Sequence, residues 1–330
     1  MLLGCHPSAP PSAAAVPDGD TTSPGAGATT IAEDSPPAAA ERRVHLTFDD
    51  APVMSEPGDG LPGPERVMAI NEAIVGTLRE RDVPASVFFN CSRLQPHERS
   101  VELWAAAGLT VGNHTDTHAK LSKVPLDEWM DDVIRCDQVL RERLPRPPHW
   151  FRYPYLDQGD RVELRDEAAR RLAELGYANA HVTVATTEWL LAYVYREASR
   201  RGDEALRDEV VAAYRQHMVE AVEQGWALAE HEVGHGTAQV ALLHVNELAA
   251  DHLGEVIDDL RARGWTLVGL EEALDDPVFD RPDHYVGRGG LSWLARIHDE
   301  SEPRPSYWFG EEEARLMQRY GELWRPPAGE

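Results

Sequence analysis

The chain has 330 residues, of which 42% are hydrophobic, so it is long enough for one large domain or two small ones with a sizeable core. Its formal net charge of −25 argues against nucleic acid or an anionic membrane surface as a partner. No apolar run in the sequence approaches the length of a membrane-spanning helix.

The first 40 residues differ in composition from the rest. Residues 1–5, Met-Leu-Leu-Gly-Cys, resemble the end of a bacterial lipoprotein signal without its charged and apolar regions. Residues 6–40 are rich in Ala, Pro, Ser, Thr and Gly and cannot bury a core. We therefore expect residues 1–40 to be a disordered tether. The protein would be exported, either periplasmic or held at the membrane only through a lipid on Cys5, or cytoplasmic if Met1 is the true start.

Two further cysteines, Cys91 and Cys136, lie in the rest of the chain. They could pair in an oxidising compartment, but sequence alone does not place them close together. Because apolar residues flank both, we expect two buried free thiols.

Strand-like and helix-like segments alternate from residue 44 onward. Strands are expected at residues 44–48, 85–90, 109–112, 149–153, 180–185, 240–244 and 265–270. Helices are expected at residues 65–81, 98–107, 126–144, 161–175 and 247–263, with an inserted helical pair at 188–225. This alternation predicts parallel strands joined by crossover helices.

The motif Asn-His-Thr-Asp-Thr-His follows the third expected strand and contains His114 and His118. On a helical turn this i,i+4 spacing would direct both imidazoles toward one point, where they could hold a divalent metal. The adjacent carboxylates Asp49 and Asp50, at the end of the first strand, offer a third ligand. One carboxylate and two histidines leave coordination positions open, as a catalytic zinc site requires. The alternative is that the histidine pair is a solvated face.

Other polar residues also follow strands. Arg152, Tyr155 and His244 fall at or just past the ends of expected strands. In a (β/α) barrel the active site forms at that rim.

Four motifs, in order, resemble those of the polysaccharide deacetylase family, the NodB-homology group also called carbohydrate esterase family 4. They are Thr-Phe-Asp-Asp at 47–50, His-Thr-Asp-Thr-His at 114–118, Arg-Tyr-Pro-Tyr at 152–155 and Leu-Leu-His at 242–244. With the alternating pattern, the resemblance implies an α/β fold, a distorted (β/α) barrel similar to a TIM barrel with about seven strands. It implies a catalytic domain at residues 41–276 and leaves residues 277–330 as a C-terminal extension packed on the barrel.

The resemblance also implies roles for individual residues. Asp50, His114 and His118 would bind a divalent metal, most often zinc, with cobalt, manganese or nickel also suited to this ligand set. Asp49 would be the general base that takes a proton from the attacking water, and Arg152 would orient it through a bidentate contact. The backbone N–H of Tyr155 would donate a hydrogen bond to the oxyanion. His244 would be the general acid that protonates the leaving amine.

The sequence departs from the family pattern at two places. Glu188 stands where the family has the aspartate that tunes the catalytic histidine, one methylene longer. In the third motif, Tyr153 and Leu156 replace the usual proline and glycine. These changes put the geometry of the acid and the shape of the substrate groove in question.

The segment His231-Glu232-Val233-Gly234-His235 matches the metalloprotease signature His-Glu-x-x-His. That signature needs a regular helix, which Gly234 disfavours, so we expect a loop leading toward His244 or at most a second metal-binding surface.

The sequence thus predicts a metal-dependent hydrolase that removes N-acetyl groups from an amino-sugar polymer such as peptidoglycan, chitin or an exopolysaccharide. The alternatives are hydrolysis of a non-sugar amide in the same fold, and a lipid-anchored protein that binds glycan without turnover.

The extension carries the aromatic residues Tyr285, Trp293 and, at 307–309, Tyr-Trp-Phe, for which we expect packing rather than a sugar platform. The oligomeric state is left open.

Overall fold

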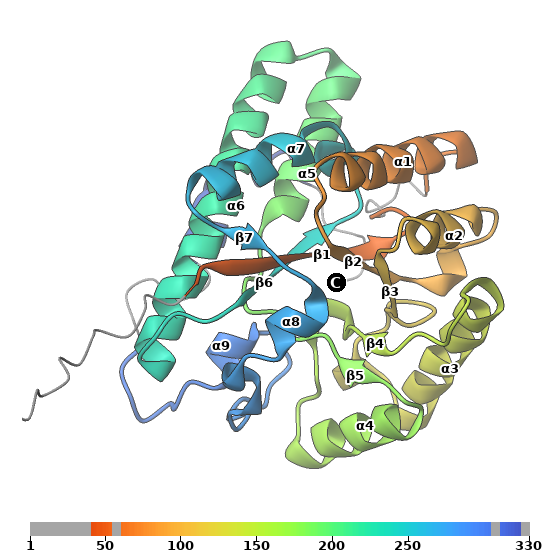
Figure 1. Cartoon of the computed structure of the whole chain (residues 1–330), viewed down its shortest axis with the longest axis vertical. Coiled ribbons are helices and arrows are strands. Elements are labelled where there is room, and N and C mark those ends of the chain that lie inside the picture. Colours follow the sequence, from red (N-terminus) through yellow and green to blue (C-terminus); the bar gives the residue numbers. More distant parts are fainter. Residues whose placement is uncertain (1–40, 55–60, 305–310, 325–330) are drawn as a thin grey trace, which may run out of the picture. The chain divides into compact units, whose positions relative to one another are not determined.

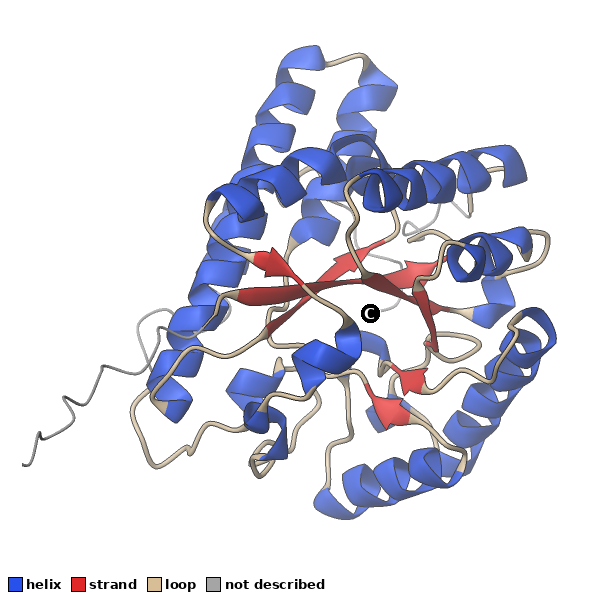
Figure 2. Ribbon diagram, in the orientation of Figure 1, coloured by secondary structure: helices blue, strands red, loops and turns tan. Residues whose placement is uncertain are grey.

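Parallel strands form one curled sheet at the centre of the fold, and helices lie around its outside (Figures 1 and 2). The computed structural model describes residues 41–54, 61–304 and 311–324. The expected tether with Cys5 and the aromatic residues at 307–309 lie outside the described residues.

The sheet has seven strands in the order β5-β4-β3-β2-β1-β6, and β7 pairs with β1. Each pair is parallel. Between β5 and β6 the described chain has only an isolated bridge, from Val184 to Ala241, so the barrel is open on that side. The strands are β1 Arg43–Ala51, β2 Ala85–Phe89, β3 Thr110–Asn113, β4 Trp150–Phe151, β5 Ala178–Asn179, β6 Gln239–His244 and β7 Thr266–Leu267. The predicted fold, a distorted (β/α) barrel, is confirmed.

Helices connect the strands and cover the outer face of the sheet (Figure 2). They are α1 Pro64–Glu80, α2 Arg99–Ala106, α3 Leu126–Arg143, α4 Val162–Glu174, α5 Glu188–Arg201, α6 Glu204–Val233, α7 Glu247–Ala262, α8 Leu270–Leu274, α9 Trp293–Arg296 and α10 Glu311–Tyr320. Short 3-10 turns lie in the connections: η1 Cys91–Arg93, η2 Leu121–Lys123 and η3 Pro154–Leu156 come between a strand and the next helix, and η4 Pro277–Asp280 follows α8.

Local chemistry explains several helix boundaries. Pro64 stands at the start of α1, where its missing N–H is not needed. The side chain of Asn246 caps α7 by accepting a hydrogen bond from the N–H of Ala249 at 2.9 Å. Gly202 ends α5 in the left-handed conformation.

The inserted helical pair is longer than expected because α6 continues past Gly225 to Val233. A Cβ at Gly225 would lie 2.5 Å from the side-chain oxygen of Gln239 in β6. The glycine is therefore explained by close packing of the helix on the sheet, and it does not end the helix.

Three expected strands are shorter or displaced in the structure, and one of them, expected at 149–153, is reduced to β4, Trp150–Phe151. The strand expected at 180–185 is instead the two-residue β5, Ala178–Asn179. The strand expected at 265–270 ends at Leu267, because Leu270 already begins α8. Both segments are apolar runs too short for periodicity to distinguish strand from helix or loop.

The two faces of β1 differ in character, as strand alternation requires. Val44, Leu46 and Phe48 belong to the main apolar cluster that packs against the helices. The alternate residues His45 and Thr47 are buried and hydrogen-bonded on the other side: His45 to Ser86 Oγ and the carbonyl of Val268, both at 2.8 Å, and Thr47 to the carbonyl of Ala241 at 2.9 Å. The inside of the barrel is therefore partly a polar network.

Cys91 and Cys136 form a disulfide with their Cα atoms 5.0 Å apart. The expectation of two free thiols is therefore wrong. The bond joins η1, at the end of β2, to α3 across a sequence separation of 45 residues.

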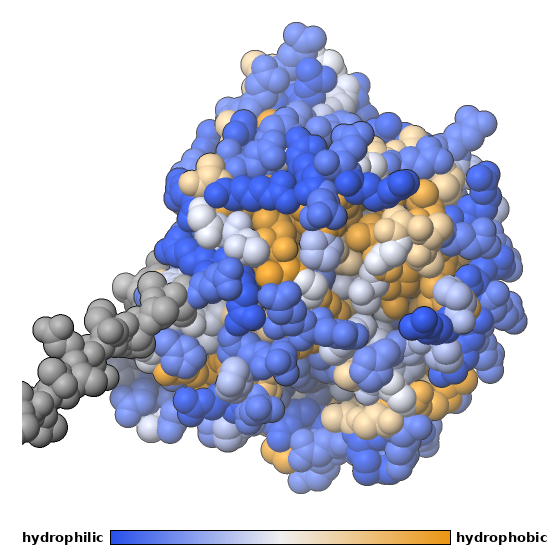
Figure 3. Space-filling view, viewed as in Figure 1, coloured by the Kyte–Doolittle hydropathy of each residue, from blue (hydrophilic) through white to orange (hydrophobic). Residues whose placement is uncertain are grey.

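Hydrophilic side chains cover most of the face shown in Figure 3. None of the helices among the described residues combines the length and the apolar composition needed to cross a membrane.

Candidate active site

The strand ends of β1 and β6 bring two candidate catalytic residues side by side. Asp49 and His244 are direct partners in the parallel register of these strands. Asp50 follows with a φ of 59°, a left-handed backbone conformation that is uncommon for aspartate. This reversal places consecutive carboxylates in different surroundings.

Asp50, His114 and His118 form a cluster whose ligand atoms all lie within 4.8 Å of one another. Oδ1 of Asp50 is 3.1 Å from Nε2 of His118 and 3.6 Å from Nε2 of His114. The same Oδ1 is buried and has no hydrogen-bond partner. A buried carboxylate oxygen facing two imidazole nitrogens fits a divalent metal, which would satisfy all three.

The pKa shifts of these three groups favour their deprotonated forms, which are the forms that bind a metal. Burial and the neighbouring His118 lower the pKa of His114 well below 6.5, and burial also lowers the pKa of His118. Burial alone would raise the pKa of Asp50, but the charges of His118 and Arg93 lower it well below its usual value. His114 also contacts the carbonyl of Arg152 through Nδ1 at 2.7 Å, which directs Nε2 toward Asp50.

The two histidines reach the cluster from a loop. β3 ends at Asn113, and neither His114 nor His118 is in a helix. Thr115 and His118 have φ values of 66° and 63°, so the expected helical turn is wrong, although its i,i+4 spacing correctly paired the two rings. Their centroids are 4.9 Å apart.

Side chains of the motif and of neighbouring elements hold this loop. Asn113 accepts a hydrogen bond from the N–H of Thr115 at 2.8 Å, and Asn90 donates to the carbonyl of His114 at 2.7 Å. Asp132 in α3 accepts from the N–H of Thr117 at 3.0 Å. Sequence reasoning missed Asn90 and Asp132 because nothing in their local sequence indicates this long-range contact.

Asp49 is buried against Arg152, which also lines the polar interior of the barrel. Nη1 of Arg152 donates to both oxygens of Asp49, at 3.0 and 3.1 Å, while Nη2 donates to Thr47 at 3.2 Å and Nε to the carbonyl of Ala180 at 2.8 Å. The contact with Asp49 therefore reaches both carboxylate oxygens from one guanidinium nitrogen. Burial raises the pKa of Asp49 to about 6, against the opposing effect of Arg152.

Glu188 holds His244 from the first turn of α5. Its Oε1 lies 3.0 Å from Nδ1 of His244 and also accepts the backbone N–H of that residue, and its Oε2 accepts from Asn246 at 3.0 Å. Burial lowers the pKa of His244, but the hydrogen bond to Glu188 and nearby carboxylates raise it to about 9. Glu188, where the resemblance implied a shorter aspartate, thus reaches the histidine, and this contact favours the protonated imidazole in the metal-free protein.

Tyr155 lies in the turn that follows β4. Both Tyr155 and Leu156 have positive φ values, 57° and 54°. The Tyr155 side chain is 45% exposed and packs on His118 with ring centroids 4.4 Å apart. Lys120 Nζ lies 4.1 Å from the centre of the same ring. The turn thus borders the metal-ligand cluster and presents an aromatic face beside it.

The His-Glu-x-x-His segment is split between two kinds of structure. His231, Glu232 and Val233 form the last residues of α6, so the expectation of a loop is wrong for them, and Gly234 then ends the helix in the left-handed conformation. Glu232 is bound by His298 at 2.8 Å and His231 at 3.1 Å. Within the described chain, the only set of three or more ligand side chains close enough for a metal is the cluster at Asp50.

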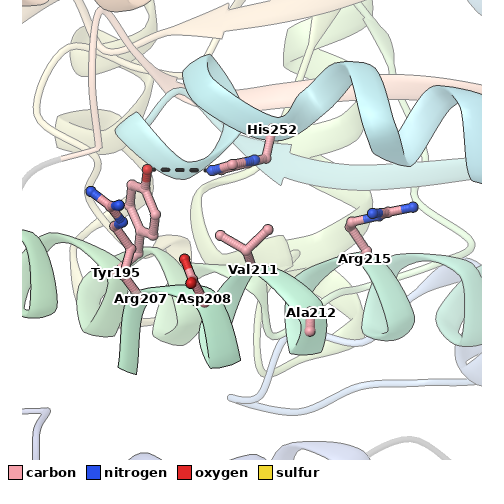
Figure 4. Close-up of a pocket in the computed structure, with 7 residues that line it drawn as sticks. All are labelled: Tyr195, Arg207, Asp208, Val211, Ala212, Arg215 and His252. Atoms are coloured by element: carbon pink, nitrogen blue, oxygen red, sulfur yellow. Dashed lines mark hydrogen bonds between the residues drawn. The ribbon is translucent and has the colours of Figure 1, made fainter. Parts of the chain in front are cut away.

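A pocket of about 520 Å³ lies elsewhere, between α5, α6 and α7 (Figure 4). Two of its polar residues have partners outside the lining: Arg215 donates to Asp259 at 2.7 Å, and Tyr195 donates to Asp251 at 2.8 Å. None of the strand-end residues lines it. The chemistry of the strand ends therefore identifies the candidate site better than cavity size does.

Comparison with known proteins gives consistent matches. A family model described as polysaccharide deacetylase matches residues 37–180. A peptidoglycan-N-acetylglucosamine deacetylase of Bacillus cereus is 25% identical over 146 residues, which cover 44% of this chain and 46% of that protein. A chitooligosaccharide deacetylase of Bradyrhizobium sp. is 26% identical over 190 residues, which cover 57% of this chain and 74% of that protein. The chain spans about half the length of the first relative.

Solved structures also match at low identity. A polysaccharide deacetylase from Bacillus cereus has a TM-score of 0.49 and 16% identity, covering 69% of this chain and 92% of that one. A CE4 family pseudoenzyme from Bacillus anthracis has a TM-score of 0.48 and 19% identity, covering 71% of this chain and 66% of that one. The family-model match ends at residue 180, before Glu188 and His244.

Proposed function

Residues 37–180 of this chain belong to the polysaccharide deacetylase family, and from that premise we propose that the protein is a metal-dependent hydrolase of N-acetyl groups on an amino-sugar polymer. The proposal covers three classes of polymer as substrate: peptidoglycan, chitin-like oligomers and an exopolysaccharide. One observation carries the proposal: Asp49 and His244 are register partners on adjacent strands beside the Asp50 cluster. That arrangement supplies a proton acceptor and a proton donor at one metal-binding rim.

The ligands of the metal would be Asp50, His114 and His118. A divalent metal bound there would supply Lewis acidity toward the acetyl carbonyl. Zinc is proposed first for two imidazoles and one carboxylate, with cobalt, manganese and nickel as alternatives.

Asp49 acts as the general base in this proposal. It accepts a proton from the attacking water while Arg152 holds both of its oxygens. In the metal-free protein, burial raises the pKa of Asp49 to about 6, so the carboxylate is ionised at neutral pH and is a stronger base than an ordinary aspartate.

Tyr155 and His244 act later in the reaction. The backbone N–H of Tyr155 donates to the oxyanion that develops on the acetyl oxygen. His244, held by Glu188 through Nδ1, protonates the departing nitrogen through Nε2. Amide hydrolysis needs this proton because an amide anion is a very poor leaving group.

The experiment is acetate release from a panel of acetylated glycans. The protein is stripped of metal with a chelator and reconstituted with zinc or cobalt. Asp50→Ala, which lacks the carboxylate ligand of the proposed metal site, serves as the matched control. We expect release that depends on added metal and is absent in Asp50→Ala. Stoichiometric metal without release from any glycan would redirect the function to a non-sugar amide or to binding, and no retained metal would reject the metal centre.

We also propose that the protein acts outside the cytoplasm, in an oxidising compartment. The disulfide between Cys91 and Cys136 supports this, because structural disulfides are rare in reducing cytoplasm. Mass spectrometry of the protein from fractionated native cells, alkylated before and after reduction, tests it. Two alkylated thiols before reduction, in a cytoplasmic fraction, would contradict it.

A further inference from the structure

The chain beyond the family-model match forms part of the candidate site. Residues 277–297 follow α8 and contain η4 and α9. Asp276 fixes the start of this segment, because its carboxylate accepts hydrogen bonds from the N–H groups of Val278 at 3.1 Å and Ala238 at 3.0 Å. The segment is thus tied to the residue that precedes β6.

Trp293 packs the end of this segment against the connection between β5 and α5. Its backbone N–H donates to the carbonyl of Val182 at 2.5 Å, and its indole N–H donates to the carbonyl of Val278 at 2.7 Å. The indole ring also lies 4.2 Å from the ring of His181, centre to centre. The connection that leads to Glu188 is therefore buttressed by this segment.

A loop at residues 283–292 projects from this base toward the turn of Tyr155. Arg296, 1% exposed, holds the first part of the loop by donating to Asp283 at 2.6 Å. Arg288 makes an exposed ion pair with Asp160 at 3.1 Å. The buried pair at the base is the firmer of the two attachments, since exposed ion pairs contribute little.

Gly290 in this loop lies directly against the backbone of Tyr155. A Cβ at Gly290 would overlap the carbonyl oxygen of Tyr155 and would lie 2.8 Å from its carbonyl carbon and 2.9 Å from Cβ of Leu156. The φ of Gly290 is not in the left-handed region, so an L-residue is excluded here by space and not by backbone conformation. Gly289 next to it would meet only the hydroxyl of Tyr285, at 3.4 Å.

The contact of Gly290 with Tyr155 matters because Tyr155 lies in a turn with an unusual backbone conformation. Tyr155 and Leu156 both have positive φ, a conformation that non-glycine residues adopt only when their surroundings enforce it. The carbonyl of Tyr155 and the N–H of Tyr155 belong to the same short turn. A side chain that pushed the carbonyl away would rotate the turn and redirect the N–H.

We propose that loop 283–292 positions the oxyanion-binding N–H of Tyr155, with Gly290 as the positioning residue. The inference rests on the proposed function for the role of that N–H. It extends the active site to a part of the chain more than 100 residues beyond the end of the family match at residue 180. An oxyanion donor must lie within hydrogen-bond distance of the developing charge, so a small displacement is costly.

The test compares Gly290→Ala with the matched control Gly289→Ala in the full chain loaded with zinc. We expect kcat for acetate release to fall about 10- to 100-fold in Gly290→Ala, with KM changed by less than about twofold, because removing an oxyanion donor costs roughly 10²–10³ in kcat. Gly289→Ala should match the wild type. Bound zinc and the melting temperature serve as structural controls.

A second readout does not depend on activity. In protein labelled with ¹⁵N-tyrosine, the Tyr155 amide signal is assigned by its loss in Tyr155→Phe. We expect that signal to move in Gly290→Ala and to stay in place in Gly289→Ala. If Gly290→Ala does not fold, Arg296→Lys loosens the base of the loop without adding an atom beside Tyr155, and the same shift and a smaller fall in kcat are expected.

The outcomes separate the two proposals. An unmoved Tyr155 signal with an unchanged kcat would overturn the role of the loop while the proposed function stands. A moved signal in a protein whose wild type releases no acetate would support the positioning and reject the function. A fall in kcat shared equally by Gly289→Ala would also overturn the assignment to Gly290.

Discussion

The two parts of the chain that meet at the candidate site build their halves differently. Residues before 180 supply the candidate metal ligands and Asp49, which lie near the end of β1 or in the loop after β3, within the residues that the family model matches. Residues after 180 supply His244 from β6, but its partner Glu188 comes from the start of a long inserted helix and is not the family aspartate. The strand ends thus place Asp49 and His244 beside each other, while the residue that contacts Nδ1 of His244 comes from the inserted helix α5.

The largest effect is expected in the first half, at Asp49. Asp49→Asn removes the proton acceptor but keeps the shape and the contact with Arg152. We expect kcat to fall on the order of 10³-fold, within the range for loss of a general base, while metal content measured by atomic absorption is retained.

Asp50→Asn is the matched control for that experiment, since it makes the same replacement of a carboxylate by an amide at the neighbouring residue. It should lose metal as well as activity. Loss of metal in Asp49→Asn, or its retention in Asp50→Asn, would show that the roles of the two carboxylates are exchanged.

In the second half, His244→Ala is expected to cost about 10²-fold in kcat on an acetylated amine substrate. An activated acetate ester has a leaving group that needs no proton, so its hydrolysis should fall much less. Metal content should match the wild type. Equal losses on amide and ester would remove His244 as the leaving-group acid.

A smaller effect is expected at Glu188. Glu188→Gln keeps the length of the side chain and removes the charge that supports protonated His244, and changes of this kind at supporting residues cost about 10- to 100-fold. Glu247→Gln is the control, because Glu247 is similarly buried and pairs with Arg196 at 2.6 Å away from the catalytic residues. If both variants lose activity equally, the loss reflects a buried carboxylate in general.

The sequence was most informative where a pattern is local. β1 and α1 were predicted within a few residues because each is a strongly apolar or periodic segment. The strand-end positions of Asp49, His114 and His244 followed from the rule that parallel strands end at one edge. These residues do meet in the structure.

Features that depend on distant partners were not predictable. His118 takes a positive φ in a loop whose backbone is held at Thr117 by Asp132, a residue of the distant helix α3. The disulfide needs η1 and α3 to be adjacent, which spacing of the cysteines does not reveal. Gly225 fits inside α6 only because the helix lies close to β6. In each case, tertiary contact overrides a local signal.

The smallest effect concerns the polar interior that supports both halves. Burial lowers the pKa of His45 to about 4, so folding favours its neutral form, and the unfolded chain binds a proton near pH 6.5 while the folded chain does not. The free energy of unfolding should therefore fall as the pH drops below 6.5, by about 1.4 kcal/mol per pH unit down to the folded pKa. His45→Asn keeps a donor for the carbonyl of Val268 but cannot titrate, so it removes this contribution.

We expect urea unfolding to show a free energy that falls by about 1.4 kcal/mol more in the wild type than in His45→Asn between pH 7.5 and pH 5.5. The control is His235→Asn, at an exposed histidine beyond the end of α6, which should keep the wild-type dependence. Parallel curves for the wild type and His45→Asn would contradict the prediction, because they would show that the pKa of His45 is the same in the folded and the unfolded chain. The barrel interior would then tolerate a charge beside Ser86, and the separation between a polar interior and an apolar outer layer would be weaker than the hydrogen bonds of His45 indicate.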